Sequence, residues 1–307
     1  MKTYIQSRGK SQDHDYTWLE VAKSEEQNSL IPPELKDIRP GDIIDSQKPS
    51  IILAHNKSKI VLLVTALRTR DERTDLVGRR IRNSVVWIAT KGGDKELLFR
   101  KLTIAALRGN LESAIDKAVD SDHNSPYGFR VSYDELQAIK ERVDEEQEDC
   151  ANGIASTGHK VGGDNIKLKE ELIEELREHP LPSASDDTQI LVAVTTMKSE
   201  KGLKEQNVWR GLSRRIKSED WIEYKPSDCN ESGSKKNNQK STTRVVLFLI
   251  LLAGVIAIII WIVTQKLTPL QVQTEQSIAP QTQTETLDLG DQKLEEVPVM
   301  TQVKPVL

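Results

Sequence analysis

Residues 50–67 read SIILAHNKSKIVLLVTAL, and this stretch decides the fold. Two apolar runs flank the polar tripeptide Asn56-Lys57-Ser58, a pattern that predicts a β-hairpin. The second run has consecutive apolar residues from Ile60 to Val64. An unbroken apolar run of this length is typical of a buried strand. The sequence therefore predicts a central strand of a sheet at residues 59–67.

Shorter strand and helix signals surround this hairpin. Residues 22–49 are polar, carry Pro32, Pro33 and Pro40, and are interpreted as a long surface connection. We expect further strands at residues 3–8, 16–21, 83–89, 128–131 and 189–196, and helices at about 95–108, 110–120, 133–147, 166–178 and 203–217. Strands mixed with helices in this order predict an α+β or mixed α/β domain, with one sheet and flanking helices.

Changes in composition divide the chain into segments. Residues 1–148 are expected to form a mixed strand and helix core, and residues 149–165, rich in Gly, Asn, Ser and Thr, a linker or long loop. Residues 166–224 form a helix–strand–helix extension. About sixty residues with one strong strand bury little core alone, so we expect this extension to complete the same sheet. Residues 225–243 are a polar tether.

A long apolar run follows the tether. Residues 245–263 read VVLFLILLAGVIAIIIWIV, without a charge, an amide or a proline. As a helix this run spans about 28 Å, close to the hydrocarbon thickness of about 30 Å. We therefore expect one transmembrane helix at residues 244–264, near the C-terminus. Residues 265–307 are rich in Gln, Thr, Pro and acids, a composition typical of disorder.

The charges around this run predict its orientation. Four basic residues lie within fifteen positions before the run and one within fifteen positions after it. Positive residues stay on the cytosolic side, so we expect a cytosolic N-terminal domain and a C-terminal tail outside. The lipid bilayer is the first expected partner.

The global composition narrows the class of protein. The chain has 307 residues and a net charge of -4, which gives no strong nucleic-acid signal. Its two cysteines do not make a disulfide framework, which fits a reducing compartment. The first residues contain no apolar run, so no cleavable signal peptide is expected.

No stretch of the sequence carries a catalytic motif. Gly9-Lys10-Ser11 resembles the end of a phosphate-binding loop, but Tyr4 stands where that loop needs a glycine. The five histidines have no spacing typical of a metal site. The sequence therefore predicts no metal, no cofactor and no particular reaction.

Residues 68–82, RTRDERTDLVGRRIR, are the most unusual segment. Arginine forks suit phosphate and carboxylate, and a glycine lets an anion approach the backbone. As a site for a small anionic ligand, the candidate residues are Arg68, Arg70, Arg73, Gly78, Arg79, Arg80 and Arg82. The alternative is a solvated hairpin whose arginines pair with Asp71, Glu72 and Asp75. We favour the alternative, because these acids balance half of the arginine charge.

The last expected helix, at about 203–217, carries a second basic cluster. Its apolar residues lie roughly along one face and are expected to pack on the sheet. The other faces carry cations that can rest on anionic lipid headgroups, namely Arg210, Arg214, Arg215 and Lys217. The alternative is an ordinary solvated helix face.

Together these patterns predict a single-pass membrane-anchored cytosolic binding module. Such a module acts as a sensor, adaptor or scaffold, with a protein partner at the membrane, and the absence of motifs favours a binder over an enzyme. The alternative is a membrane-tethered enzyme that acts on a phosphorylated or nucleotide ligand held by residues 68–82.

Overall fold

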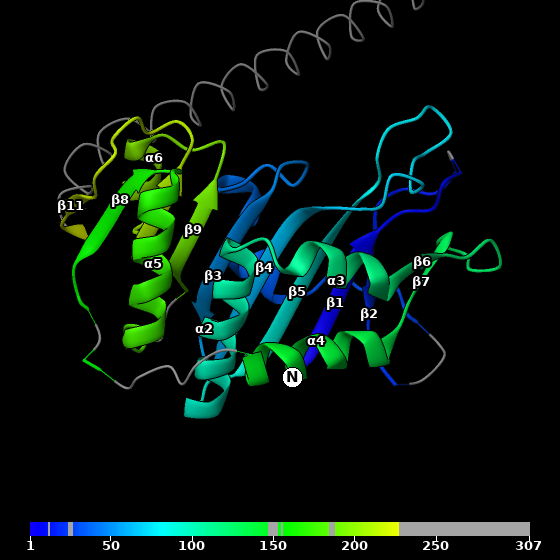
Figure 1. The fold of residues 1–307 in the computed structure, drawn as a ribbon, viewed down its shortest axis with the longest axis horizontal. Helices are drawn as coiled ribbons and strands as arrows, with labels where there is room; N and C mark the ends of the chain where they lie inside the picture. Colours follow the sequence, from blue (N-terminus) through cyan, green and yellow to red (C-terminus); the bar gives the residue numbers. More distant parts are fainter. Residues whose placement is uncertain (12, 24–26, 147–152, 155, 184–187, 227–307) are drawn as a thin grey trace, which may run out of the picture. The chain divides into compact units, whose positions relative to one another are not determined.

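One mixed sheet organises the residues that the computed structural model describes, namely 1–11, 13–23, 27–146, 153–154, 156–183 and 188–226 (Figure 1). In these residues the sheet has nine strands in the order β11-β8-β10-β9-β3-β4-β5-β1-β2. The strands are β1 Lys2–Ser7, β2 Thr17–Glu20, β3 Ser50–Asn56, β4 Lys59–Arg68, β5 Arg82–Thr90, β8 His159–Gly163, β9 Gln189–Thr195, β10 Arg210–Ser213 and β11 Ile222–Tyr224. The prediction of a mixed α/β domain with a large sheet and flanking helices is confirmed.

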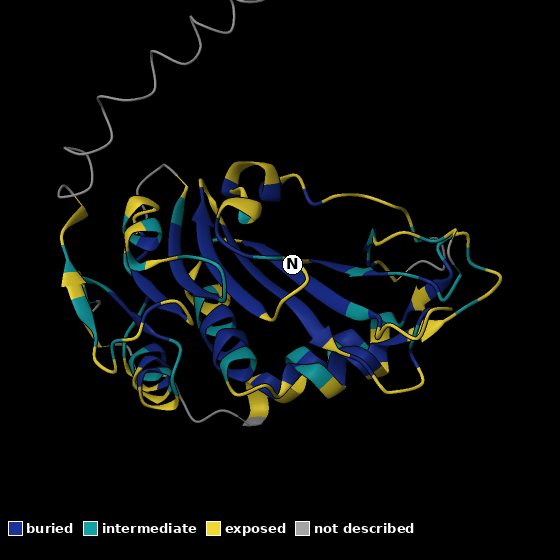
Figure 2. Ribbon diagram, turned by 90° about the horizontal axis from the view of Figure 1, so that it is seen from above, coloured by how far each residue is buried: buried dark blue, intermediate teal, exposed yellow. Residues whose placement is uncertain are grey.

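The predicted hairpin lies in the middle of this sheet. Strands β3 and β4 pair antiparallel, and no residue from Ile60 to Val64 is more than 3% exposed. Side chains alternate across a strand. Leu62 therefore joins the apolar cluster on one face, whereas Leu63 joins a second cluster on the other. The central, buried strand is confirmed, and both of its faces are covered (Figure 2).

A layer of helices covers one face of the sheet (Figure 1). Its members are α2 Gly93–Leu107, α3 Leu111–Ala118, α4 Tyr133–Glu146 and α5 Ile166–Glu178. A small hairpin of β6 Val119–Ser121 and β7 Phe129–Val131 follows α3. Arg100 of α2 is buried, and its guanidinium donates to the carbonyls of Leu176 and Arg177 at 2.7 and 2.9 Å. The last carbonyls of a helix lack partners within it, so Arg100 fixes α2 against the end of α5.

Short elements cover the opposite face. They are α1 Glu34–Ile38, the 3-10 turn η1 Pro40–Asp42 and α6 Glu200–Glu205. Leu35, Ile38 and Ile43 are buried in the second cluster. The prediction of a long surface connection at residues 22–49 is therefore wrong for this part. A five-residue helix is too short to show a helical repeat, and the prolines around it resemble those of a loop.

The segment after α4 adds four strands to the same sheet. Strand β10 runs parallel to both β8 and β9, and β9 pairs antiparallel with β3. Strand β8 lies inside residues 149–165, which were expected to form a linker or long loop. This strand has five residues and ends in two glycines, so its local sequence carries little strand signal.

The predicted helix at residues 203–217 is wrong. Helix α6 ends at Glu205, Asn207 adopts a left-handed φ of 51°, and β10 follows. The misleading signal was the spacing of Leu203, Val208, Leu212 and Ile216, which imitates a helical face. In the structure Leu203, Val208 and Ile216 join one core cluster and Leu212 joins the other, so the four residues do not share one face.

The chain divides into two units, Met1–Gln239 and Lys240–Leu307. The predicted span at 244–264 and tail at 265–307 lie outside the described residues, as does all but the start of the tether at 225–243. Among the described helices, none is long and apolar enough to cross a bilayer.

Candidate functional site

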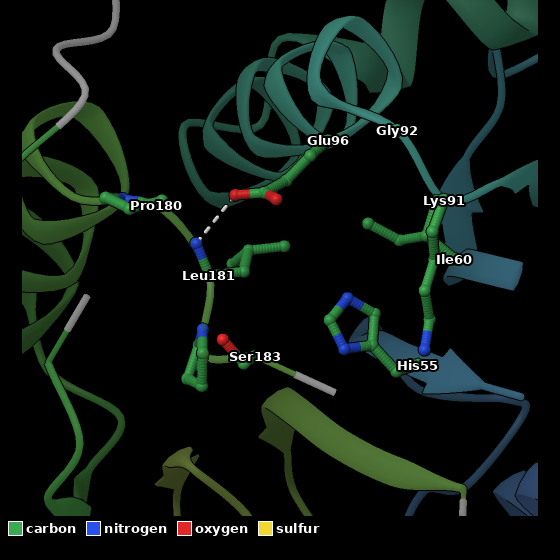
Figure 3. A pocket seen from close by; sticks show the side chains of 9 residues that line it. His55, Ile60, Lys91, Gly92, Glu96, Pro180, Leu181 and Ser183 are labelled. Carbon is green, nitrogen blue, oxygen red and sulfur yellow. Dashed lines mark hydrogen bonds between the residues drawn. The ribbon is translucent and has the colours of Figure 1, made fainter. Parts of the chain in front are cut away.

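A cavity of about 320 Å³ opens at the edge of the helix layer (Figure 3). Its walls come from the end of β3, the start of β4, the N-terminus of α2 and residues 180–183, which follow α5. The site therefore joins three parts of the chain that are far apart in the sequence, namely the β3–β4 hairpin, the start of α2 and residues 180–183. Its volume lies in the lower part of the range of small-molecule sites, roughly 300–1,000 Å³.

His55 is the central polar side chain of this cavity. It is the next-to-last residue of β3. It lies on the same face of the strand as Ile51 and Leu53, which face the helix layer. Figure 3 shows the imidazole directed into the cavity, beside the N-terminus of α2. His55 is 5% exposed, and its Nδ1 has no hydrogen-bond partner among the described residues.

The environment of His55 keeps its ring neutral. Burial, together with the ammonium of Lys91, lowers the pKa of His55 from 6.5 to about 4. A neutral imidazole has one nitrogen that donates and one that accepts. At pH 7 the cavity therefore contains an uncharged, buried group with hydrogen-bonding capacity left over.

The N-terminus of α2 supplies positive potential. Helix α2 has fifteen residues, and its N-cap Gly92 offers no side chain to the first-turn amides. These amides lack partners within the helix and carry the positive end of its dipole. The ammonium of Lys91 precedes them at the cavity wall. This combination of groups is typical of a site for an anionic group.

Part of the lining is apolar, and one segment of it is held in place. Ile60 and Leu181 are buried and line the cavity. The backbone amide of Leu181 donates to Oε1 of Glu96 at 2.8 Å, which attaches the segment after α5 to α2 (Figure 3). This bond uses one carboxylate oxygen of Glu96 and leaves the other as an acceptor for a ligand.

A second group of hollows lies at the other end of the sheet, where β8, β9 and β10 end. Ligands of open α/β sheets commonly bind at such carboxyl ends. Here, however, Asp164 pairs with Lys169 at 2.7 Å and with Arg214 at 3.2 Å. Asn165 also caps the N-terminus of α5, because its side chain accepts from the amide of Leu168 at 2.9 Å. Asp164 is therefore ion-paired with two cations and Asn165 already caps a helix, so the cavity beside His55 is the better candidate.

The arginines of residues 68–82 do not converge on one site. Arg73 is buried and donates to Ser7 Oγ at 3.0 Å and to the Val119 carbonyl at 3.1 Å. The remaining members are exposed or half-buried. Three of them form ion pairs: Arg70 with Asp116, Arg79 with Asp75 and Arg80 with Asp71. Arg82 donates to the Ala66 carbonyl. Arg68 is exposed, and Gly78 lies in an open turn.

The basic cluster near residue 210 is also dispersed. Arg210 is fully buried, and its guanidinium pairs with Glu175 and stacks on Trp209 at 4.1 Å. The expectation that Arg210 contacts lipid is therefore wrong, because its side chain lies inside the domain. Arg214, Arg215 and Lys217 are exposed, but they lie beyond a strand and not on one helix face.

Sequence reasoning missed the groups of the cavity. His55 was assigned only to a strand, although a polar residue on the buried face of an apolar strand was a usable signal. Lys91 and Glu96 flank the start of α2, which the sequence predicted only as a helix at about 95–108. Their convergence with His55 depends on how α2 packs on the sheet, which no local pattern indicates.

Within the described residues, no group of His, Cys, Asp and Glu is arranged to hold a metal ion. Comparisons with protein-family models, curated proteins and solved structures gave no match. No relative therefore assigns a role to the fold or to the cavity.

Proposed function

We propose that this protein is a single-pass membrane-anchored binding module whose cytosolic domain takes up a small carboxylic acid in the cavity beside His55. The observation that carries the ligand site is the buried imidazole of His55, which points into a cavity with Nδ1 unpartnered. The apolar run at 245–263 and the basic residues before it support the anchor and the cytosolic orientation.

A bound ligand would offset part of the free-energy cost of leaving His55 Nδ1 without a hydrogen-bond partner. A buried polar group without a partner costs about 1–3 kcal/mol, and a hydrogen bond from a ligand recovers part of it. The carboxylate of the ligand would lie against Lys91 and the first turn of α2. Its apolar part would contact Ile60 and Leu181.

The charge of the cavity favours one negative charge over two. Lys91 and Glu96 cancel as formal charges, so the helix dipole, equivalent to about half a charge, leaves a modest positive excess. This excess suits a monoanionic carboxylate better than a phosphate dianion. The second oxygen of Glu96 favours a ligand that also carries an amino or hydroxyl donor.

The anchor adds a physical role to this binding. A tether restricts the domain to a surface and raises its effective concentration for partners there. A domain that binds a small acid beside a membrane fits a sensor or adaptor that presents its ligand state to a protein partner.

The enzyme alternative has less support. A general base works best with a pKa near the working pH, and a pKa of about 4 makes His55 a weak base at pH 7. The arginines of residues 68–82, proposed to hold a phosphorylated or nucleotide ligand, are largely paired with carboxylates.

Calorimetric titration of the full chain in detergent tests the proposal. The panel contains small amino and hydroxy acids, the matching simple acids, and their uncharged amides. We expect saturable binding of an acid that has a donor group, and at least tenfold weaker binding to Lys91→Gln and His55→Gln. The matched control is Lys95→Gln, an exposed lysine on α2 outside the cavity. Absence of saturable binding across the panel, or equal weakening by Lys95→Gln, contradicts the proposal.

A further inference from the structure

The connection between β4 and β5 is a narrow hairpin that extends beyond the sheet (Figure 1). Thr74 and Arg80 form an isolated antiparallel bridge, and the amide of Asp75 donates to the carbonyl of Arg79 at 2.9 Å. The two arms of the loop are therefore paired through their backbones. Residues 74–80 are called the 74–80 tip below.

Asp75 holds the apex of this tip in shape. Its carboxylate is buried, and Oδ1 accepts from the amides of Val77 at 3.0 Å and Arg79 at 2.9 Å. Gly78 has a φ of 77°, a left-handed conformation that residues with a Cβ rarely adopt. The apex is thus built by its own hydrogen bonds and does not depend on packing of its apolar side chains.

The apolar side chains of the apex project into water. Leu76 is 72% exposed and Val77 is 60% exposed. Apolar surface gains free energy when it leaves water, in proportion to the area removed. A preformed turn that presents two adjacent aliphatic side chains therefore has a driving force for contact with an apolar phase.

Arginines surround this apolar apex. The side chain of Arg79 is 72% exposed, that of Arg80 41% and that of Arg70 53%. Each makes an ion pair, but a guanidinium has five donors, and its exposed part can bind a second anion. Residues 68–82 contain six arginines and three carboxylates, so the segment has an excess of positive charge.

We propose that the 74–80 tip is a docking site for an anionic lipid leaflet. Leu76 and Val77 enter between the headgroups, while Arg79 and Arg80 contact lipid phosphates. A protein partner fits this apex less well, because Leu and Val are under-represented among the residues that dominate protein interfaces. The inference goes beyond ligand binding and rests on the proposed anchor only for the nearness of a bilayer.

The length of the chain permits this contact. Seventeen residues, 227–243, separate the end of the described part from the proposed span. Fully extended they reach about 55 Å. A nine-stranded sheet is about 40 Å wide, because neighbouring strands lie about 4.8 Å apart. The extended tether is therefore longer than the sheet is wide, which leaves the domain room to turn its tip toward the leaflet that holds the anchor.

The test uses the full chain reconstituted in vesicles with a single environment-sensitive dye. Cys150 and Cys229 are replaced by serine, and the dye is attached to a new cysteine, Leu76→Cys. Vesicles contain phosphatidylcholine alone or with about one third phosphatidylserine. The matched control carries the dye at Ser58→Cys, an exposed position in the turn at the opposite end of β4.

We expect the dye at position 76 to shift to shorter wavelength only in anionic vesicles and to return to its aqueous emission in high salt. The dye at position 58 shows no shift. Adding Arg79→Gln and Arg80→Gln to the labelled chain abolishes the shift, since each cation near an anionic surface contributes about a fivefold gain.

Several results overturn the proposal. One is an aqueous emission at position 76 in both kinds of vesicle, which is also the result if the tip binds a protein instead. Another is a shift that survives loss of both arginines. If the chain does not float with vesicles, the proposed membrane anchor is wrong, and so is the proposal that the 74–80 tip docks on lipid. Ligand binding is measured in detergent without vesicles, so failure of the ligand proposal remains distinguishable.

Discussion

Replacement of His55 with glutamine should change the pH dependence of stability. The pKa of His55 is about 4 in the folded protein and 6.5 in the unfolded chain. Because the unfolded state takes up the proton more readily, stability is greatest above pH 6.5 and falls as the pH drops toward 4. Each pKa unit corresponds to about 1.4 kcal/mol, so the full effect is about 3.4 kcal/mol.

The measurable part of this effect lies between pH 7 and pH 5. Over this interval a shift of this size contributes about 1.8 kcal/mol. Water that enters the open side of the cavity screens the imidazolium, so we expect a loss of about 1.5 kcal/mol. Glutamine is uncharged throughout, so the His55→Gln variant should lack this component of the loss.

The assay is urea unfolding of residues 1–226, which contain all nine strands and both core clusters. The free energy of unfolding is measured at pH 7 and pH 5 for the wild-type fragment, His55→Gln and the control His123→Gln, whose side chain is exposed. The wild-type fragment and the control should lose about 1.5 kcal/mol more than His55→Gln. Equal losses in all three proteins would refute the reasoning.

Three further predictions concern the architecture. Truncation after residue 226 should give a soluble, folded domain. Truncation at residue 150 removes β9 and leaves one edge of β3 unpaired, so that fragment should aggregate in size-exclusion chromatography. Glu175→Gln leaves the buried Arg210 without its carboxylate and should cost about 2 kcal/mol in urea unfolding, while the exposed neighbour Glu174→Gln should cost under about 0.5 kcal/mol. In a glycosylating host the sequon at Asn230 should stay unmodified, and a glycan there contradicts the cytosolic orientation; Asn56 is 3% exposed, so its sequon does not report topology.

The centre of the sheet could be predicted because its signals are local. An apolar run with polar residues on both sides specifies the β3–β4 hairpin wherever the rest of the chain folds. The same holds for α5, whose buried residues Leu168, Leu172 and Leu176 repeat at helical spacing. Elements of four to six residues, such as α1 and β10, contain too few repeats, and their type depends on the surface against which they pack.

Arg210 illustrates why charge alone misleads. Four basic residues among apolar ones resemble the polar face of a helix, and no local pattern indicates that Glu175 and Trp209 enclose one of them. The arginines of residues 68–82 were easier, because Asp71 and Asp75 are near in sequence. The partner Asp116 was not predictable, since α3 brings it to Arg70 from a distant part of the chain.

The cavity could not be predicted from the sequence for a similar reason. His55 and Ile60 come from one hairpin, but Lys91 and Glu96 reach the site only because α2 packs on the sheet beside α5. Leu181 is placed by its bond to Glu96. A site assembled from separate layers leaves no spacing in the sequence.

The central claim, that a small carboxylic acid binds beside His55, is tested most directly by NMR titration of residues 1–226 labelled in histidine. The acid that binds most tightly in calorimetry is added at saturation, and the pKa of each imidazole is followed. A carboxylate next to the ring favours its charged form, so the pKa of His55 should rise from about 4. An unchanged His55 titration in the presence of bound acid contradicts the account.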